Sequence, residues 1–143
     1  MEVKIKQIDK FQFVVQARSH SLICDQPMDN GGEDSGMTPP ELMLASLGAC
    51  AEFYAVQYLR ARKIGDHGVE VTVTAEKLTQ PARLGNFRIH VAYPADLSAE
   101  LKEGLRRSVH HCLIHNTLLS VPSVEIELAV GEPADALTDA GVL

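Results

Sequence analysis

A long, largely apolar segment between residues 42 and 62 limits what this chain can fold into more than any other feature. Thr38, a pair of prolines and Glu41 precede it, and they predict a helix start because a threonine side chain caps free amides and proline is tolerated in the first turn. Ala, Leu and Met dominate the segment itself, so we expect about six turns of helix. The first half is apolar on every side and is expected to run through the centre of the molecule. Such a helix needs more cover than one small sheet supplies, which favours a dimer.

The same segment is too short and too interrupted to predict a membrane span. Its longest apolar run, residues 42–51, contains Ser46 and Gly48 and stops at Glu52, whereas a span needs about 20 apolar residues. The first ten residues lack the apolar core of an export leader, which predicts a cytoplasmic protein. A formal net charge of -6 disfavours binding to phosphate backbones and anionic membranes. Neither nucleic acid nor a membrane is therefore an expected partner.

Apolar and polar residues alternate on both sides of this helix, which is typical of half-buried strands. Three short strands are predicted before the helix and a hairpin after it, with a turn near residues 81–85. The alternating stretches are 3–5, 11–15, 22–24, 69–73 and 87–91. Residues 25–38 are rich in Gly, Asn, Asp and Ser, which predicts a surface loop of a length that is often functional.

A second helix is predicted to begin after Ser98, whose side chain can cap it. Its core-facing stripe includes Cys112, and Asn116 is expected to end or bend the helix. The members of the stripe are Leu101, Leu105, Ser108 and Cys112.

The carboxyl-terminal part is predicted to hold one more strand and a tail. Val124, Ile126 and Leu128 alternate with other residues as in a half-buried strand, and residues 132–143 have the composition of a loosely held tail. No internal repeat is present, so residues 1–131 are expected to form a single domain.

Three cysteines, Cys24, Cys50 and Cys112, are present. In a reducing compartment a disulfide is more often transient and catalytic than structural. Cys50 and Cys112 are predicted on two helices that could bring their Cα atoms within about 7 Å, close enough for a redox pair. The alternative, that both are small buried apolar residues, stays open. Cys24 ends a strand and is expected to be structural.

The sequence does not predict a metal or nucleotide cofactor. His111 and His115 share a helix face, as zinc ligands often do, but no second ligand pair of a known zinc motif is present. Gly31 and Gly36 have the spacing of a phosphate-binding loop, but Met37 occupies the position of its lysine. We therefore expect no cofactor.

The run Gly36–Leu42, continued by Leu44–Cys50, resembles the signature of the OsmC/Ohr family, the osmotically inducible and organic-hydroperoxide-resistance proteins. The order of predicted elements agrees with that family from about Val3 to Val130. The resemblance implies an α+β fold with antiparallel sheets packed on two long central helices. It also implies an intertwined homodimer with active sites at the subunit interface.

The same resemblance implies roles for three residues and leaves the position of a fourth, a glutamate, unmatched. Cys50 matches the peroxidatic cysteine, and Cys112 matches the cysteine that resolves its sulfenic acid as a disulfide, which a dithiol then reduces. Arg18 matches by location an arginine that holds the reactive thiol. The family glutamate is expected ten residues before the cysteine, where Pro40 stands. Glu41 is nine residues before the cysteine, so it lies about 100° around the helix from the expected position. The pattern resembles a less characterised branch of the family.

A reactive thiol has its own physical requirement. A free cysteine has a pKa near 8.5 and burial raises it, so a nearby cation is needed to keep a thiolate at neutral pH. The dipole of its own helix fades within the first turn and does not reach Cys50. Arg18 is the best candidate, with the three histidines at positions 110, 111 and 115 as lesser ones. The alternative that Arg18 is only a solvated turn residue stays open.

The leading hypothesis is a cofactor-free thiol peroxidase that reduces organic hydroperoxides in oxidative-stress defence. Its site residues are Cys50, Cys112, Arg18 and Glu41. An apolar wall for the substrate's alkyl chain is predicted at Met43, Leu47, Phe53 and Tyr54. The competing hypothesis is an OsmC-like dimeric protein that binds a small ligand or responds to redox state without efficient peroxidase turnover, and Pro40 favours it.

Overall fold

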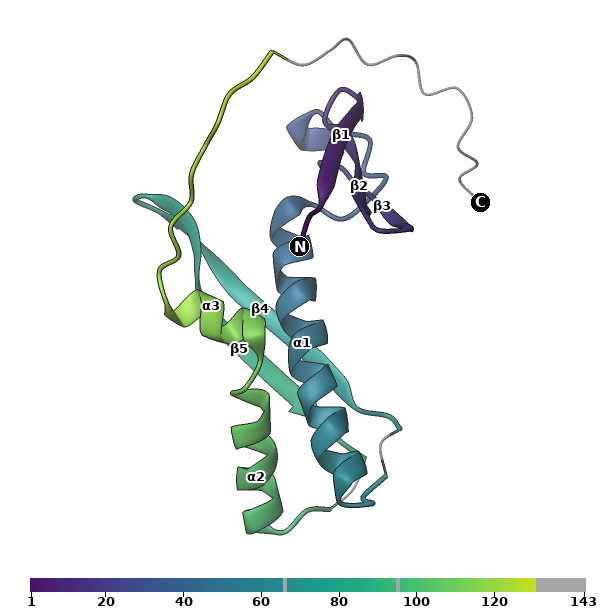
Figure 1. Ribbon diagram of the computed structural model, residues 1–143, viewed down its shortest axis with the longest axis vertical. Coiled ribbons are helices and arrows are strands. Elements are labelled where there is room, and N and C mark those ends of the chain that lie inside the picture. Colours follow the sequence, from purple (N-terminus) through teal and green to yellow (C-terminus); the bar gives the residue numbers. More distant parts are fainter. Residues whose placement is uncertain (66, 95, 131–143) are drawn as a thin grey trace.

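A computed structural model of the chain describes residues 1–65, 67–94 and 96–130 (Figure 1). The three predicted amino-terminal strands are confirmed: β1 (Lys4–Asp9), β2 (Gln12–Ala17) and β3 (His20–Cys24) form an antiparallel sheet in the order β1-β2-β3. The turns between these strands place Lys10 and Arg18 at positive φ.

The loop at residues 25–38 is ordered by one buried carboxylate. Asp25 accepts hydrogen bonds from the amides of Gln26 and Glu33 and from both the amide and the hydroxyl of Ser35. Burial raises the pKa of Asp25, but these hydrogen bonds together outweigh burial and lower the pKa to about 2. At Gly32 a Cβ atom would lie 1.9 Å from the Gln26 carbonyl oxygen, so the backbone packs too closely for a side chain. The loop is therefore a fixed connection, with a short helix, η1 (Met28–Asn30), inside it.

The long helix α1 (Pro39–Ala61) begins as predicted. Thr38 caps it and exchanges hydrogen bonds with Glu41 in a capping box. Burial does not follow the prediction, because the first half of α1 is not enclosed by this chain and Met43 is exposed. The buried residues of the helix are Leu47, Gly48, Ala51, Ala55, Tyr58 and Leu59.

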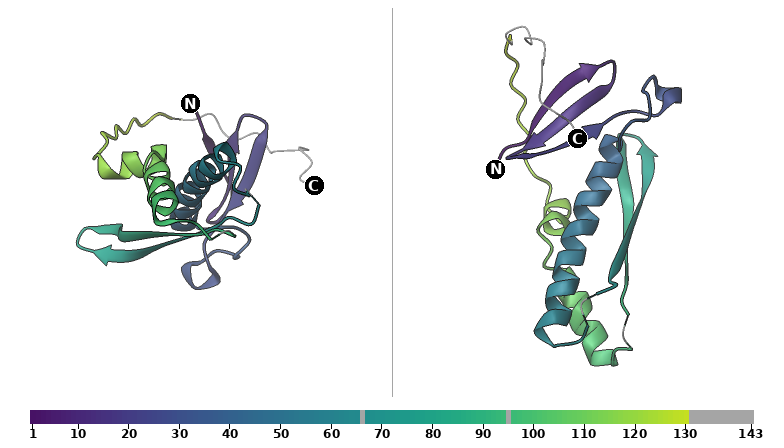
Figure 2. Two further views of the ribbon diagram at one scale, coloured as in Figure 1. Left: turned by 90° about the horizontal axis from the view of Figure 1, so that it is seen from below. Right: turned by 90° about the vertical axis from the view of Figure 1, so that its right-hand side faces the viewer.

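The hairpin of β4 (Glu70–Thr79) and β5 (Ala82–Ala92) lies along α1 (Figure 2). Its turn is at Gln80 and Pro81, tighter than predicted, and the register shifts between Thr74 and Glu76. Gly48 allows close approach, because a Cβ there would lie 3.1 Å from Cγ2 of Val73. By length and hydropathy alone α1 could cross a membrane, but its contacts with the hairpin and the later helices make it the central helix of this fold.

Two shorter helices complete the packed part of the chain. The helix α2 (Ala99–Val109), capped by Ser98 as predicted, packs on the second half of α1. The core there consists of Ala55, Tyr58, Leu59, Leu97 and Leu105. Gly104 permits this contact, because a Cβ in its place would lie 2.0 Å from the Tyr58 hydroxyl oxygen.

The second predicted helix is in fact two helices. α2 ends at Val109, and α3 (Leu113–Leu119) follows after a turn at His110 and His111. Cys112 therefore does not lie on the α2 stripe; it is the N-cap of α3 and is fully buried between the two helices. Asn116 lies inside α3 and does not end it.

The predicted carboxyl-terminal strand is wrong for the isolated chain. Residues 121–130 form no strand and run outward from α3 (Figure 1), with Ile126 83% and Leu128 94% exposed. A strand needs a neighbouring edge for its backbone hydrogen bonds, and no strand edge in the described part of the chain pairs with the segment. The predicted tail, 132–143, lies outside the described residues.

Candidate functional site

The two helix cysteines meet where α1 contacts α3. Cys50 lies one residue before the buried Ala51 and is itself half-buried, whereas Cys112 is fully buried. Cys112 Sγ accepts a hydrogen bond from the His115 amide at 3.3 Å, and a further hydrogen bond joins the two thiols. Both are free thiols. The predicted juxtaposition of Cys50 and Cys112 is therefore present within one chain.

The two thiols differ in their tendency to ionise. Burial raises the pKa of Cys50, but hydrogen bonds from the Cys112 thiol and from the main-chain amides of Ile114 and Leu113 lower it below that of a free cysteine. Burial, the hydrogen bond to Cys50 and its negative charge raise the pKa of Cys112. Cys50 therefore ionises more readily than Cys112, and the Cys112 thiol is the donor in the hydrogen bond between them.

The amides that stabilise the Cys50 thiolate were missed from the sequence. They belong to the first turn of α3, where amides have no partner within the helix. The sequence pattern indicated cationic side chains and gave no sign of a second helix start beside Cys50. These amides could be predicted only if the end of α2 and the start of α3 were predicted. The sequence gives no capping motif at that point, because cysteine is not a common N-cap residue.

Glu41 does not reach Cys50 in this chain. Nine residues of helix separate the two by about 13.5 Å along the axis and about 180° around it. The Glu41 carboxylate instead accepts hydrogen bonds from the amide and hydroxyl of Thr38. Those two bonds lower the pKa of Glu41. Its observed role in the single chain is to start α1.

Arg18 also lies away from the cysteines in this chain. It occupies the β2–β3 turn at φ 56°, a left-handed conformation that costs a non-glycine residue about 1–2 kcal/mol. Its sheet lies beyond the amino-terminal end of α1 and has no extensive contact with the other described elements (Figure 2). The structure thus brings Cys50 and Cys112 together but not Arg18 or Glu41.

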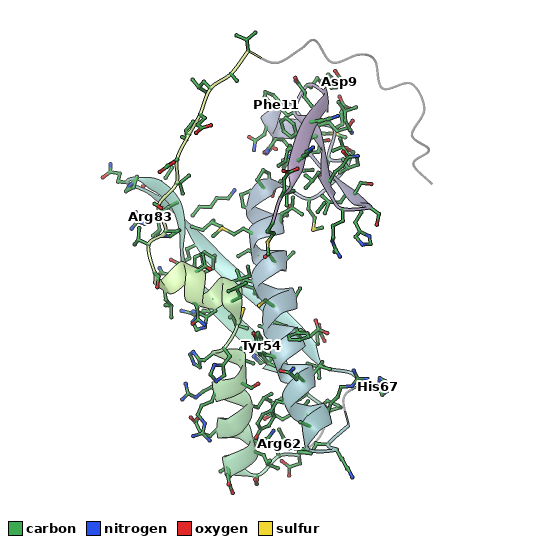
Figure 3. All side chains as sticks on the ribbon, in the orientation of Figure 1. Asp9, Phe11, Tyr54, Arg62, His67 and Arg83 are labelled. Carbon is green, nitrogen blue, oxygen red and sulfur yellow. The ribbon has the colours of Figure 1, made fainter. Side chains whose placement is uncertain are left out.

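The predicted apolar wall is divided between two faces of α1. Met43 and Leu47 line a cavity of about 960 Å³ that also borders β5, α2 and α3. Phe53 lines a second hollow of about 710 Å³ on another face of the helix. Tyr54 lies between α1 and the helices beside it (Figure 3), where its carbonyl oxygen accepts a hydrogen bond from the Ser108 hydroxyl.

Basic side chains and histidines line part of the larger cavity. Arg83 lies near the end of the hairpin, above α3 (Figure 3). The other such residues are Lys102, Arg106, His110 and His115. His111 is exposed and is not part of the cavity lining. Among the described residues, no three His, Cys, Asp or Glu side chains are grouped so that they could hold a metal ion.

Cys24 is separate from the other two cysteines. It ends β3, is buried, and forms a parallel bridge with Met37. Burial raises the pKa of its thiol, and the neighbouring Asp25 carboxylate raises it further. The environment of Cys24 therefore suits a packed, unreactive thiol, which agrees with the expectation from the sequence.

Comparisons with known proteins agree with this fold. A family model described as OsmC-like protein matches residues 32–127, whereas no protein of curated function matches the sequence. An OsmC-like protein from Mycoplasma pneumoniae is 21% identical with a TM-score of 0.72, over 84% of this chain and 87% of its own. A Psychrobacter arcticus protein, described as an osmotic stress induced and detoxification response protein, is 19% identical with a TM-score of 0.74. The match covers 80% of this chain and 85% of that protein.

A third solved structure carries a redox description. It is a Legionella pneumophila protein described as an organic hydroperoxide resistance protein OsmC and predicted redox protein. It is 21% identical with a TM-score of 0.56, over 82% of this chain and 89% of its own. At these identities the three structures support the α+β fold. Together with the family model they show that the chain belongs to the OsmC-like protein family.

Proposed function

We propose that this protein is a thiol peroxidase that reduces organic hydroperoxides, with Cys50 as the peroxidatic and Cys112 as the resolving cysteine. One observation carries the proposal: two hydrogen-bonded thiols whose pKa values are shifted in opposite directions. A peroxidatic thiol must be ionised to act as a nucleophile, and a resolving thiol must lie beside it.

In the first step the Cys50 thiolate attacks the distal peroxide oxygen. A sulfur–oxygen bond forms, the oxygen–oxygen bond breaks, and the alkoxide leaves and takes up a proton to become an alcohol. The amides of Leu113 and Ile114 donate to the Cys50 sulfur and favour its negative charge before the attack. The product on the protein is a Cys50 sulfenic acid.

In the second step Cys112 attacks the sulfenic sulfur. A disulfide forms and water leaves, so Cys112 is oxidised while Cys50 is reduced. A dithiol then reduces the disulfide, and both thiols return. These steps use no metal or organic cofactor, and the dithiol donor suits the cytoplasmic location that we propose.

A homodimer would supply what one chain lacks. The amino-terminal sheet and residues 121–130 both expose apolar side chains, including Ile5, Phe11 and Ile126, and unpaired strand segments of this kind favour pairing with another chain. In a two-fold dimer each sheet would pack on the other copy, and Arg18 would lie near the Cys50 of that copy. Its guanidinium would then lower the pKa of Cys50 further and bind the peroxide oxygens.

The substrate class is inferred from the lining of the larger cavity. Apolar residues from α1, β5, α2 and α3 form most of it, among them Met43, Leu47 and Leu118. A surface of this kind favours an alkyl or aryl group over the bare hydrogen peroxide molecule. Cys50 is not among the residues that line this cavity, so we propose that the cavity holds the alkyl or aryl part of an organic hydroperoxide.

The test is consumption of cumene hydroperoxide with dithiothreitol as the reductant. Cys50→Ser is expected to abolish consumption, and Cys112→Ser to leave one turnover that stops at the Cys50 sulfenic acid. Cys24→Ala serves as the matched control, since Cys24 belongs to another site. Equal consumption by the wild type and Cys50→Ser would contradict the peroxidase. Disulfide formation with negligible turnover would instead support the competing redox-responsive function.

A further inference from the structure

Two histidines at the junction of α2 and α3 have no role in the steps above. The His115 amide donates to Cys112 Sγ at 3.3 Å, so the main chain of His115 lies against that sulfur. The ring lies against the ring of His110, with centroids 5.0 Å apart and the planes tilted by 47°. His115 Nδ1 is buried and has no hydrogen-bond partner among the described residues. A buried nitrogen without a partner requires an explanation.

The outer end of the histidine pair reaches solvent. His110 is exposed, and its Nε2 lies 3.0 Å from Arg106 Nη1. A guanidinium only donates, so this bond requires a lone pair on His110 Nε2 and places the ring proton on Nδ1. Arg106 is held in turn by Glu103 at 2.7 Å. His110 is therefore held between the half-buried His115 ring and the Arg106 guanidinium.

The surroundings of the pair contain further titratable groups. From β5, Arg83 and Tyr93 line the same cavity as the two histidines, and from α2 Lys102 and Arg106 do so. No carboxylate of the described residues lines that cavity, and Glu103 beside it is engaged with Arg106. Of the groups that line this cavity and can take up a proton, His115 is the one whose own amide contacts the Cys112 sulfur.

Disulfide formation needs such a proton acceptor. Cys112 is fully buried, and burial raises the pKa of its thiol, so it keeps its proton when Cys50 has become a sulfenic acid. We propose that His115 Nδ1 accepts the Cys112 proton during attack on the Cys50 sulfenic sulfur, and that the His110 ring packed beside it keeps the His115 ring in position. This inference rests on the proposed peroxidase function and assigns a residue to its second step.

The step balances without another reactant. The Cys112 sulfur forms a bond to the Cys50 sulfur while the sulfur–oxygen bond of the sulfenic acid breaks. The thiol proton passes to His115 and then to the leaving hydroxide, which departs as water. The Cys112 sulfur is oxidised and the Cys50 sulfur is reduced, and His115 ends in its starting state.

The test separates the two steps of the cycle. Fully reduced protein is mixed with one equivalent of cumene hydroperoxide, the Cys50 sulfenic acid is trapped with dimedone, and the disulfide is quantified after alkylation. His115→Gln is expected to form the sulfenic acid at the wild-type rate but to form the disulfide about a hundredfold more slowly, the usual scale of general base catalysis. The sulfenic acid should therefore accumulate. His111→Gln, an exposed histidine of the same segment, should behave as the wild type.

Two further measurements distinguish proton transfer from a packing effect. The loss of disulfide rate at acid pH should be present in the wild type and absent in His115→Gln. Imidazole added to His115→Ala should restore the disulfide rate, because the adjoining cavity of about 960 Å³ can admit it. A purely structural role for His115 would give neither result.

The outcomes also separate this inference from the proposed function. Equal disulfide rates in the wild type and His115→Gln, after normal sulfenic acid formation in both, would overturn the role of His115 and leave the peroxidase intact. Absence of sulfenic acid in the wild type would overturn the peroxidase and the role of His115 with it.

Discussion

The chain contains two regions, one that packs against itself within a single copy and one that does not. The helices α1, α2 and α3 with the β4–β5 hairpin share a core and bring Cys50 and Cys112 together. The β1–β3 sheet has no extensive contact with the described part of that unit, exposes apolar side chains, and carries Arg18. The difference teaches that the thiol pair is a property of one chain, whereas the cation proposed for it depends on a second copy.

The most severe test of this difference mixes two defective subunits. Cys50→Ser alone should abolish peroxide reduction, and Arg18→Met alone should lower it at least about tenfold, since a nearby cation shifts a pKa by about 1–3 units. If Arg18 serves the other copy, a mixed dimer has one intact site. Random pairing then restores about a quarter of the wild-type sites. Steady-state peroxide reduction after co-refolding measures this.

The matched comparison uses the same two proteins refolded separately and then combined without exchange. If co-refolded protein is no more active than this mixture, Arg18 acts on its own chain or not at all. The two regions would then be independent, contrary to the proposed dimer.

A second prediction concerns the exposed carboxyl-terminal segment. Ile126→Asp removes an apolar side chain whose burial against another copy would contribute about 1.5–3 kcal/mol. Because a two-fold dimer would lose this side chain from both copies, we expect dimer dissociation to become at least about 100-fold easier, as measured by sedimentation equilibrium. Glu127→Gln, one residue along the segment, is the control and should leave the association constant nearly unchanged. Unaltered association of Ile126→Asp would exclude this segment from the interface.

A third prediction tests the packed unit by itself. Gly104→Ala places a Cβ 2.0 Å from the Tyr58 hydroxyl oxygen, and such overpacking lowers the free energy of unfolding by about 1–3 kcal/mol. Gly65→Ala is the control, because a Cβ there meets no atom of the described residues within 4 Å. Urea denaturation of the two variants should show the difference. Equal midpoints would mean that α1 and α2 pack less closely than described.

The smallest expected effect concerns the loop that joins the two regions. The folded pKa of Asp25 is about 2, lower than about 3.9 in an unfolded chain. Its ionised form therefore stabilises the fold above about pH 4, and that contribution is lost as the pH falls toward 2. The melting temperature of Asp25→Asn should change less than that of the wild type across this interval. Parallel curves would show that Asp25 does not order the loop.

Local signals in the sequence were enough to predict most of the elements. The capping box at Thr38 and Glu41 and the alternating strand patterns lie within a few residues, so β1 to β3, α1 and the hairpin could be predicted. The break between α2 and α3 could not, because Leu105, Ser108 and Cys112 fit one continuous helical stripe. The break is seen in the structure alone, where residues 110 and 111 form a turn and Cys112 is the N-cap of α3.

The site was predicted in part for the same reason. Cys50 and Cys112 lie on elements that touch within the chain, so their meeting could be inferred from two helix patterns. Glu41 was assigned by analogy, and the helix geometry directs it away from Cys50. The alternating residues near Ile126 do predict a strand, but a strand forms only where a partner edge exists, and sequence periodicity does not say on which copy that edge lies.

The donors to the Cys50 sulfur are main-chain amides of Leu113 and Ile114, and this affects how freely the sequence can change in evolution. An amide does not titrate and belongs to every residue except proline, so the two side chains can drift among apolar choices while the electrostatic preference for a thiolate persists. Such support leaves almost no trace in the pattern of amino-acid replacement. Proline at either position is the substitution that would remove it.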